Sequence, residues 1–82
     1  MAKTFHLTIA RVGENLFDGE AQSVLLPGAD GTFEVLAGHE AFVSPLKAGE
    51  AHVTAGSGEK YRFELTEGGI AEVSQNQATV LL

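Results

Sequence analysis

The hydrophobic and polar positions of this chain alternate with a period of two in several short segments. Phe5, Leu7 and Ile9 occupy alternate positions near the start, and residues 61–65 repeat the pattern. Such alternation is typical of a β-strand with one buried and one exposed face. No segment keeps apolar residues at the helical spacing over the roughly 10–12 residues that a helix needs. The pattern therefore predicts an all-β chain.

Glycine and proline mark where the predicted strands end. The dipeptides Asp18-Gly19 and Asp30-Gly31 favour tight hairpin turns, because both residue types tolerate positive φ. Pro27 is expected to end the strand before it, since proline has no amide hydrogen for the ladder. We expect nine or ten short strands, in residues 4–12, 16–17, 20–26, 32–36, 40–46, 50–55, 59–66, 70–74 and 77–82.

Length and composition favour a small globular domain. The 82 residues predict one domain with a modest core, and disulfides are excluded because the chain has no cysteine. The hydrophobic fraction of 44% is ordinary for a globular protein. A sandwich or flattened barrel is the simplest way to bury so many narrow, half-apolar strands.

The net charge of −6 argues against nucleic acid as a partner. The basic side chains are scattered and form no patch that would neutralise phosphates: Lys3, Arg11, Lys47, Lys60 and Arg62. No apolar run approaches the ~20 residues of a membrane span, so direct insertion into a bilayer is not expected. The first residues lack the apolar segment of a signal peptide, so we expect a cytoplasmic protein.

The sequence contains no recognisable pattern of catalytic or cofactor-binding residues. His6, His39 and His52 lack the paired spacing of metal-binding histidines, so no metal is expected. The glycine-rich residues 28–38 contain no lysine, and no helix is predicted after them, which argues against a phosphate-binding loop and a bound nucleotide. No serine lies in a nucleophile elbow. We therefore expect no catalytic residue and no cofactor.

Apolar side chains beyond what a small core can bury are another source of function. Phe42, Val43 and Leu46 are the main candidates, together with the apolar faces of the short strands. Each position taken singly is more simply interpreted as core. A group of them on one sheet face or at one loop end would instead indicate docking on a partner.

Residues 26–39 carry the most informative motif of the chain. They read LPGADGTFEVLAGH and are similar to the L-P-G-x-x-G-x-x-G-V-L-P-G-H signature of the epsilon subunit of F-type ATP synthases. Further segments resemble the same family in the same order, in residues 1–7, 17–21, 46–49, 68–73 and 78–82. Each segment alone is weakly specific, but their order and spacing along the whole chain make the resemblance strong.

The resemblance implies a ten-stranded β-sandwich, a flattened barrel of two five-stranded sheets that spans residues 1–82. It implies a non-catalytic central-stalk (rotor) subunit of a proton-translocating ATP synthase. Such a subunit links the gamma subunit to the c-ring and transmits rotation during ATP synthesis. It lies peripherally on the cytoplasmic face of an energy-transducing membrane, with no cofactor and no nucleotide expected.

The resemblance also implies residues that contact the two partners. The c-ring side is expected to include Asp30, Gly31, Thr32, Gly38, His39, Glu40, Ala41 and Phe42. Arg11 and His39 are the candidates for the gamma side.

The chain departs from the family pattern at four positions and at its end. Ala37, Ala41 and Ala48 stand where the family usually has proline, which should make those loops less rigid, and Glu34 stands where it usually has glycine. Family members normally continue beyond the position of Leu82 into a helical hairpin. The inhibitory and ATP-binding roles of that hairpin are therefore expected to be absent.

Two other functions remain open on the residues alone. A stand-alone β-sandwich that binds a peptide or a sugar would need its own ligand groove. A small hydrolase or metal enzyme would need a histidine and carboxylates close together in a concave site.

Overall fold

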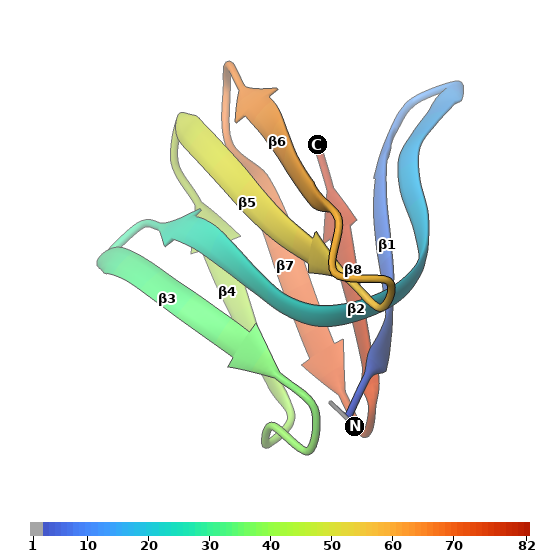
Figure 1. The fold of residues 1–82 in the computed structure, drawn as a ribbon. Helices are drawn as coiled ribbons and strands as arrows, with labels where there is room; N and C mark the ends of the chain where they lie inside the picture. Colours follow the sequence, from blue (N-terminus) through green and yellow to red (C-terminus); the bar gives the residue numbers. More distant parts are fainter. Residues whose placement is uncertain (1–2) are drawn as a thin grey trace.

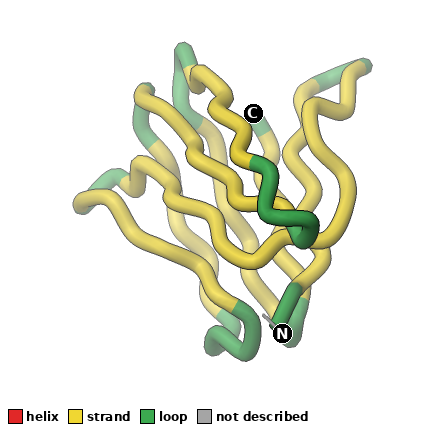
Figure 2. The backbone as a smooth tube through the Cα atoms, viewed as in Figure 1, coloured by secondary structure: helices red, strands yellow, loops and turns green. Residues whose placement is uncertain are grey.

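The computed structural model describes residues 3–82, and strands make up most of this range, with no helix among them (Figure 2). The all-β prediction is confirmed. The strands are β1 (Phe5–Arg11), β2 (Glu14–Gly28), β3 (Gly31–Leu36), β4 (Phe42–Leu46), β5 (Gly49–Ala55), β6 (Lys60–Leu65), β7 (Gly69–Ser74) and β8 (Gln77–Leu81).

The strands are hydrogen-bonded in the order β1-β8-β7-β4-β2-β5-β6, with β3 on β2 and a further pairing of β1 with β2. Five of them, β1, β8, β7, β4 and β2, therefore form a closed ring, although β4 meets β2 only at the pair Leu46 and Gly28. Figure 1 shows β3, β5 and β6 in front of β4, β7 and β8. This arrangement is compatible with a β-sandwich. The expected ten strands in two separate five-stranded sheets are not confirmed, because shared strands join all eight described strands into one sheet.

The long strand β2 explains part of the difference in strand number. Its 15 residues run straight through Asp18-Gly19, so the predicted hairpin turn at this dipeptide is wrong. Asp18 pairs with Thr8 and Gly19 with Leu7, so the ladder with β1 outweighs the local turn preference. The second half of β2 pairs with β3 on one edge and with β5 on the other.

Two further turn predictions need correction. The β2–β3 turn occupies Ala29 and Asp30, one residue earlier than predicted, and the positive φ of 135° falls on Gly31. Pro27 does not end its strand but pairs with Thr32 inside β2. Its carbonyl oxygen accepts a hydrogen bond from the Lys47 amide at 2.9 Å, which ties β2 to the segment after β4.

All eight strands contribute to one apolar core. The predicted inward positions of β1 are confirmed, since Phe5, Leu7 and Ile9 are at most 1% exposed. Burial of each such side chain contributes roughly 1.5–3 kcal/mol to stability. No polar or charged residue is buried among the residues that the structure describes. The interior is therefore purely structural, and any recognition must take place on the surface.

Candidate functional site

The surface of residues 3–82 offers little to an enzyme. Three hollows of about 250, 350 and 340 Å³ are close to the lower end of the range for small-molecule sites. Within these residues, no three histidine, aspartate or glutamate side chains are placed to hold a metal ion. None of the described segments is a helix that could cross a membrane. The exposed sheet faces and the loops are the remaining candidates.

The predicted c-ring residues lie in two separate places. Residues 30–32 are at the β2–β3 turn, whereas residues 38–42 form the loop after β3 and the start of β4. The length of β3 separates the two segments, as Figure 1 shows. The second segment is ordered by aromatic contacts, because the Phe42 ring centroid is 4.9 Å from that of His39 and 5.4 Å from that of Phe33.

The two predicted gamma-side residues are also far apart. Arg11 is at the end of β1, next to the β1–β2 turn, while His39 is in the β3–β4 loop. Figure 1 places these two connections at opposite ends of the molecule. Arg11 has a local partner, since its Nε lies 3.7 Å from Oε1 of Glu14. Arg11 and His39 therefore do not belong to one cluster.

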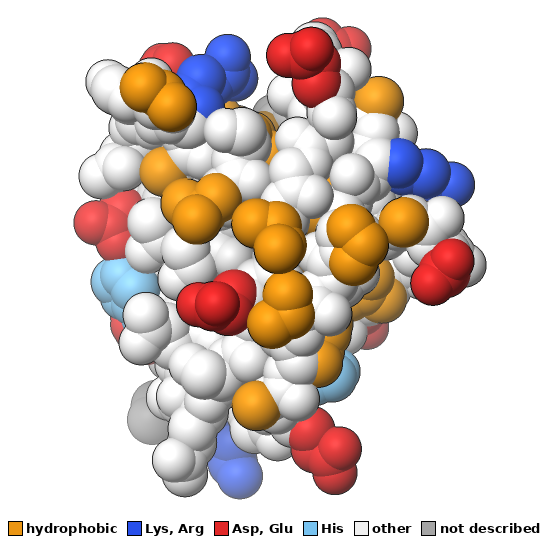
Figure 3. Space-filling view, turned by 180° about the vertical axis from the view of Figure 1, so that it is seen from behind, with side chains coloured by type: hydrophobic (Ala, Val, Ile, Leu, Met, Phe, Trp, Pro, Cys, Tyr) orange, Lys and Arg blue, Asp and Glu red, His pale blue; other side chains and the backbone are white. Residues whose placement is uncertain are grey.

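An apolar band crosses the outer face of four adjacent strands, β4, β7, β8 and β1. Cross-strand pairs place Pro45 beside Ile70, Ile70 beside Leu81 and Leu81 beside Ala10. Val43 lies two positions from Pro45 on the same face, and these five residues define the band. Three of its members are strongly exposed, Val43 at 58%, Ile70 at 43% and Leu81 at 52%. Figure 3, which views this side, shows hydrophobic side chains gathered across it.

The sequence indicated only part of this band. Among the three surface candidates, Val43 points outward, Phe42 is half-buried and Leu46 is in the core at 7% exposure. Ile70 and Leu81 were not singled out, although each occupies an outward position of an alternating strand. The signal was present in the alternation, but adjacency of the four strands was needed to see it.

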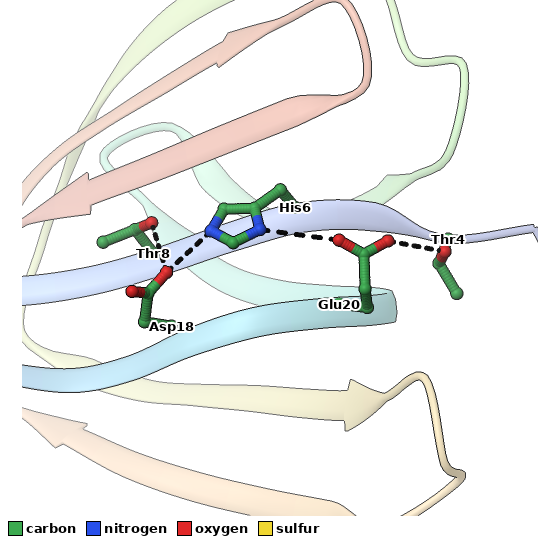
Figure 4. A network of polar contacts seen from close by, with 5 residues as sticks. All are labelled: Thr4, His6, Thr8, Asp18 and Glu20. Carbon is green, nitrogen blue, oxygen red and sulfur yellow. Dashed lines mark hydrogen bonds and ion pairs between the residues drawn. The ribbon is translucent and has the colours of Figure 1, made fainter.

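A polar network centred on His6 lies on the same sheet face, at the pairing of β1 with β2. Figure 4 shows the His6 ring held between two carboxylates. Nε2 of His6 is 2.6 Å from Asp18 Oδ1, and Nδ1 is 3.5 Å from Glu20 Oε2. Thr4 donates a hydrogen bond to Glu20 at 2.8 Å, and Thr8 donates one to Asp18 at 3.3 Å. The His6 side chain is exposed.

The carboxylates stabilise the protonated form of His6. The hydrogen bond with Asp18 is the largest cause that raises its pKa, and the charges of Asp18 and Glu20 act in the same direction. Desolvation, the second largest contribution, lowers the pKa but does not outweigh the others. The two ring nitrogens point to opposite sides, so the three groups do not converge on one point as metal ligands would.

The outer face on the other side, formed by β5 and β6, has a different character. There Glu50 lies 3.3 Å from His52 and 3.6 Å from Arg62, so acidic and basic groups alternate. On β6, Tyr61 is 40% exposed and its ring packs against those of Phe17 and Phe63. The exposed apolar side chains of β2 and β3 are Leu25 at 38% and Leu36 at 50%.

Comparison with known proteins places this fold. A family model for the β-sandwich domain of the ATP synthase delta/epsilon chain matches residues 4–82. The chain belongs to this family. The resemblance seen in the sequence is therefore confirmed, and it now covers nearly every residue that the structure describes.

Individual curated relatives lead to the same family. An ATP synthase epsilon chain from Rhodopseudomonas palustris is 44% identical over 95% of this chain and 56% of its own length. An ATP synthase epsilon chain from Chlorobium limicola is 37% identical over 96% of this chain and 89% of its own length. The chain thus spans little more than half of several curated relatives and most of another.

Solved members support the fold. A chain of the Euglena gracilis mitochondrial ATP synthase, determined with its c-ring, superposes with a TM-score of 0.87 at 26% identity. That match covers 95% of this chain and 49% of the other. A chain of the Tetrahymena thermophila ATP synthase central stalk and c-ring gives a TM-score of 0.77 over 98% of this chain and 63% of its own length. At 16% identity the second match shows the fold alone.

Proposed function

We propose that this chain is a non-catalytic rotor subunit of a proton-translocating ATP synthase, joining the gamma subunit to the c-ring in the central stalk. Membership of the delta/epsilon family supports this role. The observation that carries it is the apolar band, because an exposed apolar strip across four strands is the character of a docking surface. In this role the chain lies peripherally on the cytoplasmic face of the membrane and needs no cofactor or nucleotide.

A coupling subunit must pass torque from one partner to the other without deforming. The closed ring of hydrogen-bonded strands and the single packed core suit that task, since close-packed interiors transmit strain. Torque also requires two contact regions on one body. The band on the sheet face and the turns at the strand ends provide two such regions.

The band is the proposed gamma contact. It reaches Ala10, which precedes Arg11, and Val43, which follows Phe42, the aromatic neighbour of His39. A gamma surface lying along the band would therefore approach both of the residues expected from the sequence. The c-ring contact is proposed for the β2–β3 turn and the β3–β4 loop, with the residues expected from the sequence.

Co-expression with the cognate gamma subunit, followed by native mass spectrometry, tests this role. We expect a one-to-one complex with the unchanged chain. Ile70→Asp and Leu81→Asp should each abolish it, because a charge would be buried in an apolar contact. Leu25→Asp and Leu36→Asp are matched controls at similar exposure on the other face and should bind normally. Absence of the wild-type complex, or equal loss in the controls, would count against the role.

The peptide- or sugar-binding alternative has less support. The hollows on the described surface are open to solvent, and none is lined by a converging set of buried polar groups. A ligand groove of its own would need both features. The band, by contrast, is an exposed apolar sheet face of the kind that a protein partner covers.

A further inference from the structure

The sheet face that carries the apolar band is acidic on its other half. In cross-strand register, Asp18 of β2 pairs with Thr8 of β1, Thr8 with Thr79 of β8, and Thr79 with Glu72 of β7. Glu20 lies two positions from Asp18 on the same strand and completes the set of carboxylates. With strands about 4.8 Å apart, this row crosses the sheet directly beside the band.

Among the exposed positions of β1, β4, β7 and β8, the one basic side chain is Arg11 at the end of β1, and its Nε lies 3.7 Å from Oε1 of Glu14. No lysine or arginine of residues 3–82 forms an ion pair with Asp18, Glu20 or Glu72. The opposite face differs, because there Glu50 lies beside Arg62 and His52. The asymmetry is therefore a property of this face and does not follow from the net charge alone. An apolar strip bordered by charges of one sign selects a partner with the complementary arrangement.

We propose that this face binds a gamma-subunit surface with basic side chains opposite Asp18, Glu20 and Glu72 beside an apolar strip, and that His6 makes this binding depend on pH. The proposal rests on the proposed function, which supplies the identity of the partner. It adds the chemistry of the partner surface and a titrating group at its edge.

His6 is the titrating group because it lies between two of the three carboxylates. Asp18 and Glu20 face it from β2, and its neighbour on β8 is Gln77, which is uncharged. The backbone amide of His6 donates a hydrogen bond to the carbonyl oxygen of Asn76 at 3.1 Å. Asn76 is uncharged, so the residue that the turn after β7 places beside His6 adds no charge either. The charge presented by this corner of the face is therefore set by these three side chains.

The direction of the pH effect follows from the charges. Above its pKa, His6 is neutral and leaves both carboxylates fully negative toward the partner. Below its pKa, the imidazolium offsets one of them and competes with the basic groups of gamma. Binding should therefore strengthen as the pH rises through the pKa of His6, which lies above its ordinary value near 6.5. Complex formation near that pH should release protons.

The pH test compares two histidine variants. The dissociation constant for isolated gamma is measured between about pH 6 and about pH 8.5, a range in which histidine titrates. Wild-type affinity should rise several-fold, and His6→Gln should keep the high-pH affinity with a flat profile. His52→Gln is the matched control, because it removes a histidine with a carboxylate neighbour from the other face. It should follow the wild-type profile.

The charge test compares two exposed glutamates. Glu72→Lys should weaken binding by about tenfold and reduce its salt dependence, as expected for a charge at the rim of an interface. Glu34→Lys, on the exposed side of β3, should change neither. Thermal unfolding of each variant checks that the fold is retained.

The outcomes separate this inference from the proposed function. If wild type binds gamma while His6→Gln keeps the pH profile and Glu72→Lys binds as tightly, the inference is overturned and the function stands. If wild type fails to bind gamma at any pH and salt concentration, both are overturned.

Discussion

Gly68 shows how a single residue fixes the approach of two elements. It has a φ of 80° in the connection before β7, and a Cβ placed on it would overlap the backbone oxygen of Leu46. Neighbouring Gly69 is in the same situation against the backbone oxygen of Leu81. The pair of glycines is visible in the sequence, but the contact of Gly68 with a strand more than twenty residues away could not be predicted from it.

Gly68→Ala should lower the free energy of unfolding by roughly 2–4 kcal/mol, through positive-φ strain and backbone overlap together. Chemical denaturation measures the change. Gly13→Ala is the matched control, because Gly13 has a similar φ of 78° but open space around its Cβ. It should cost only about 1 kcal/mol. Equal losses in the two variants would show that close packing at Gly68 is unimportant.

At the scale of elements, the local pattern was enough to predict strands with clear alternation. It was not enough where pairing between strands decides whether the chain turns or continues. The inward sets of β1, β7 and β8 follow directly from the alternation. Asp18-Gly19 misled because a dipeptide preference of this kind is weaker than a continuous ladder with β1. The apolar band was out of reach for a related reason, since it depends on the order of non-consecutive strands.

Gly19→Ala distinguishes a continuous β2 from a turn at this position. Gly19 has no positive φ, and its Cβ would meet no atom within 4 Å. Alanine should therefore stabilise the protein by about 0.5–1 kcal/mol, because it restricts the unfolded chain. Gly31→Ala should do the reverse, since Gly31 also has open space but a φ of 135°. If denaturant titrations showed that Gly19→Ala destabilises the protein, the result would favour the predicted turn over a continuous β2.

At the scale of the whole molecule, the described chain is a body with an apolar core, one acidic and apolar face and one face of mixed charge. The family and its fold were within reach of the sequence, because the motif at residues 26–39 and the alternation both act locally. The expected contact residues stay predictions. The structure divides them between the two ends of β3 and the far end of β1, so they cannot form one continuous patch.

A molecule that works only through protein contacts should be indifferent to small ligands. Thermal unfolding in zinc, manganese or magnesium-ATP should give the same midpoint as in buffer alone. A site occupied at about 100 times its dissociation constant would add about 2.7 kcal/mol, or more than roughly 10 °C for a domain of this size. A rise of that magnitude with any of the three would reopen the enzyme and nucleotide hypotheses.

The parallel pairing of β1 with β8 has a consequence for how the chain folds as it is synthesised. His6 lies beside Gln77, so nearly the whole polypeptide separates the two partners. Residues 77–81 must therefore leave the ribosome before β1 can pair with β8. Until then the edge of β1 that pairs with β8 has no neighbouring strand. Folding of this domain is thus expected to be slow, as is usual when distant segments must meet.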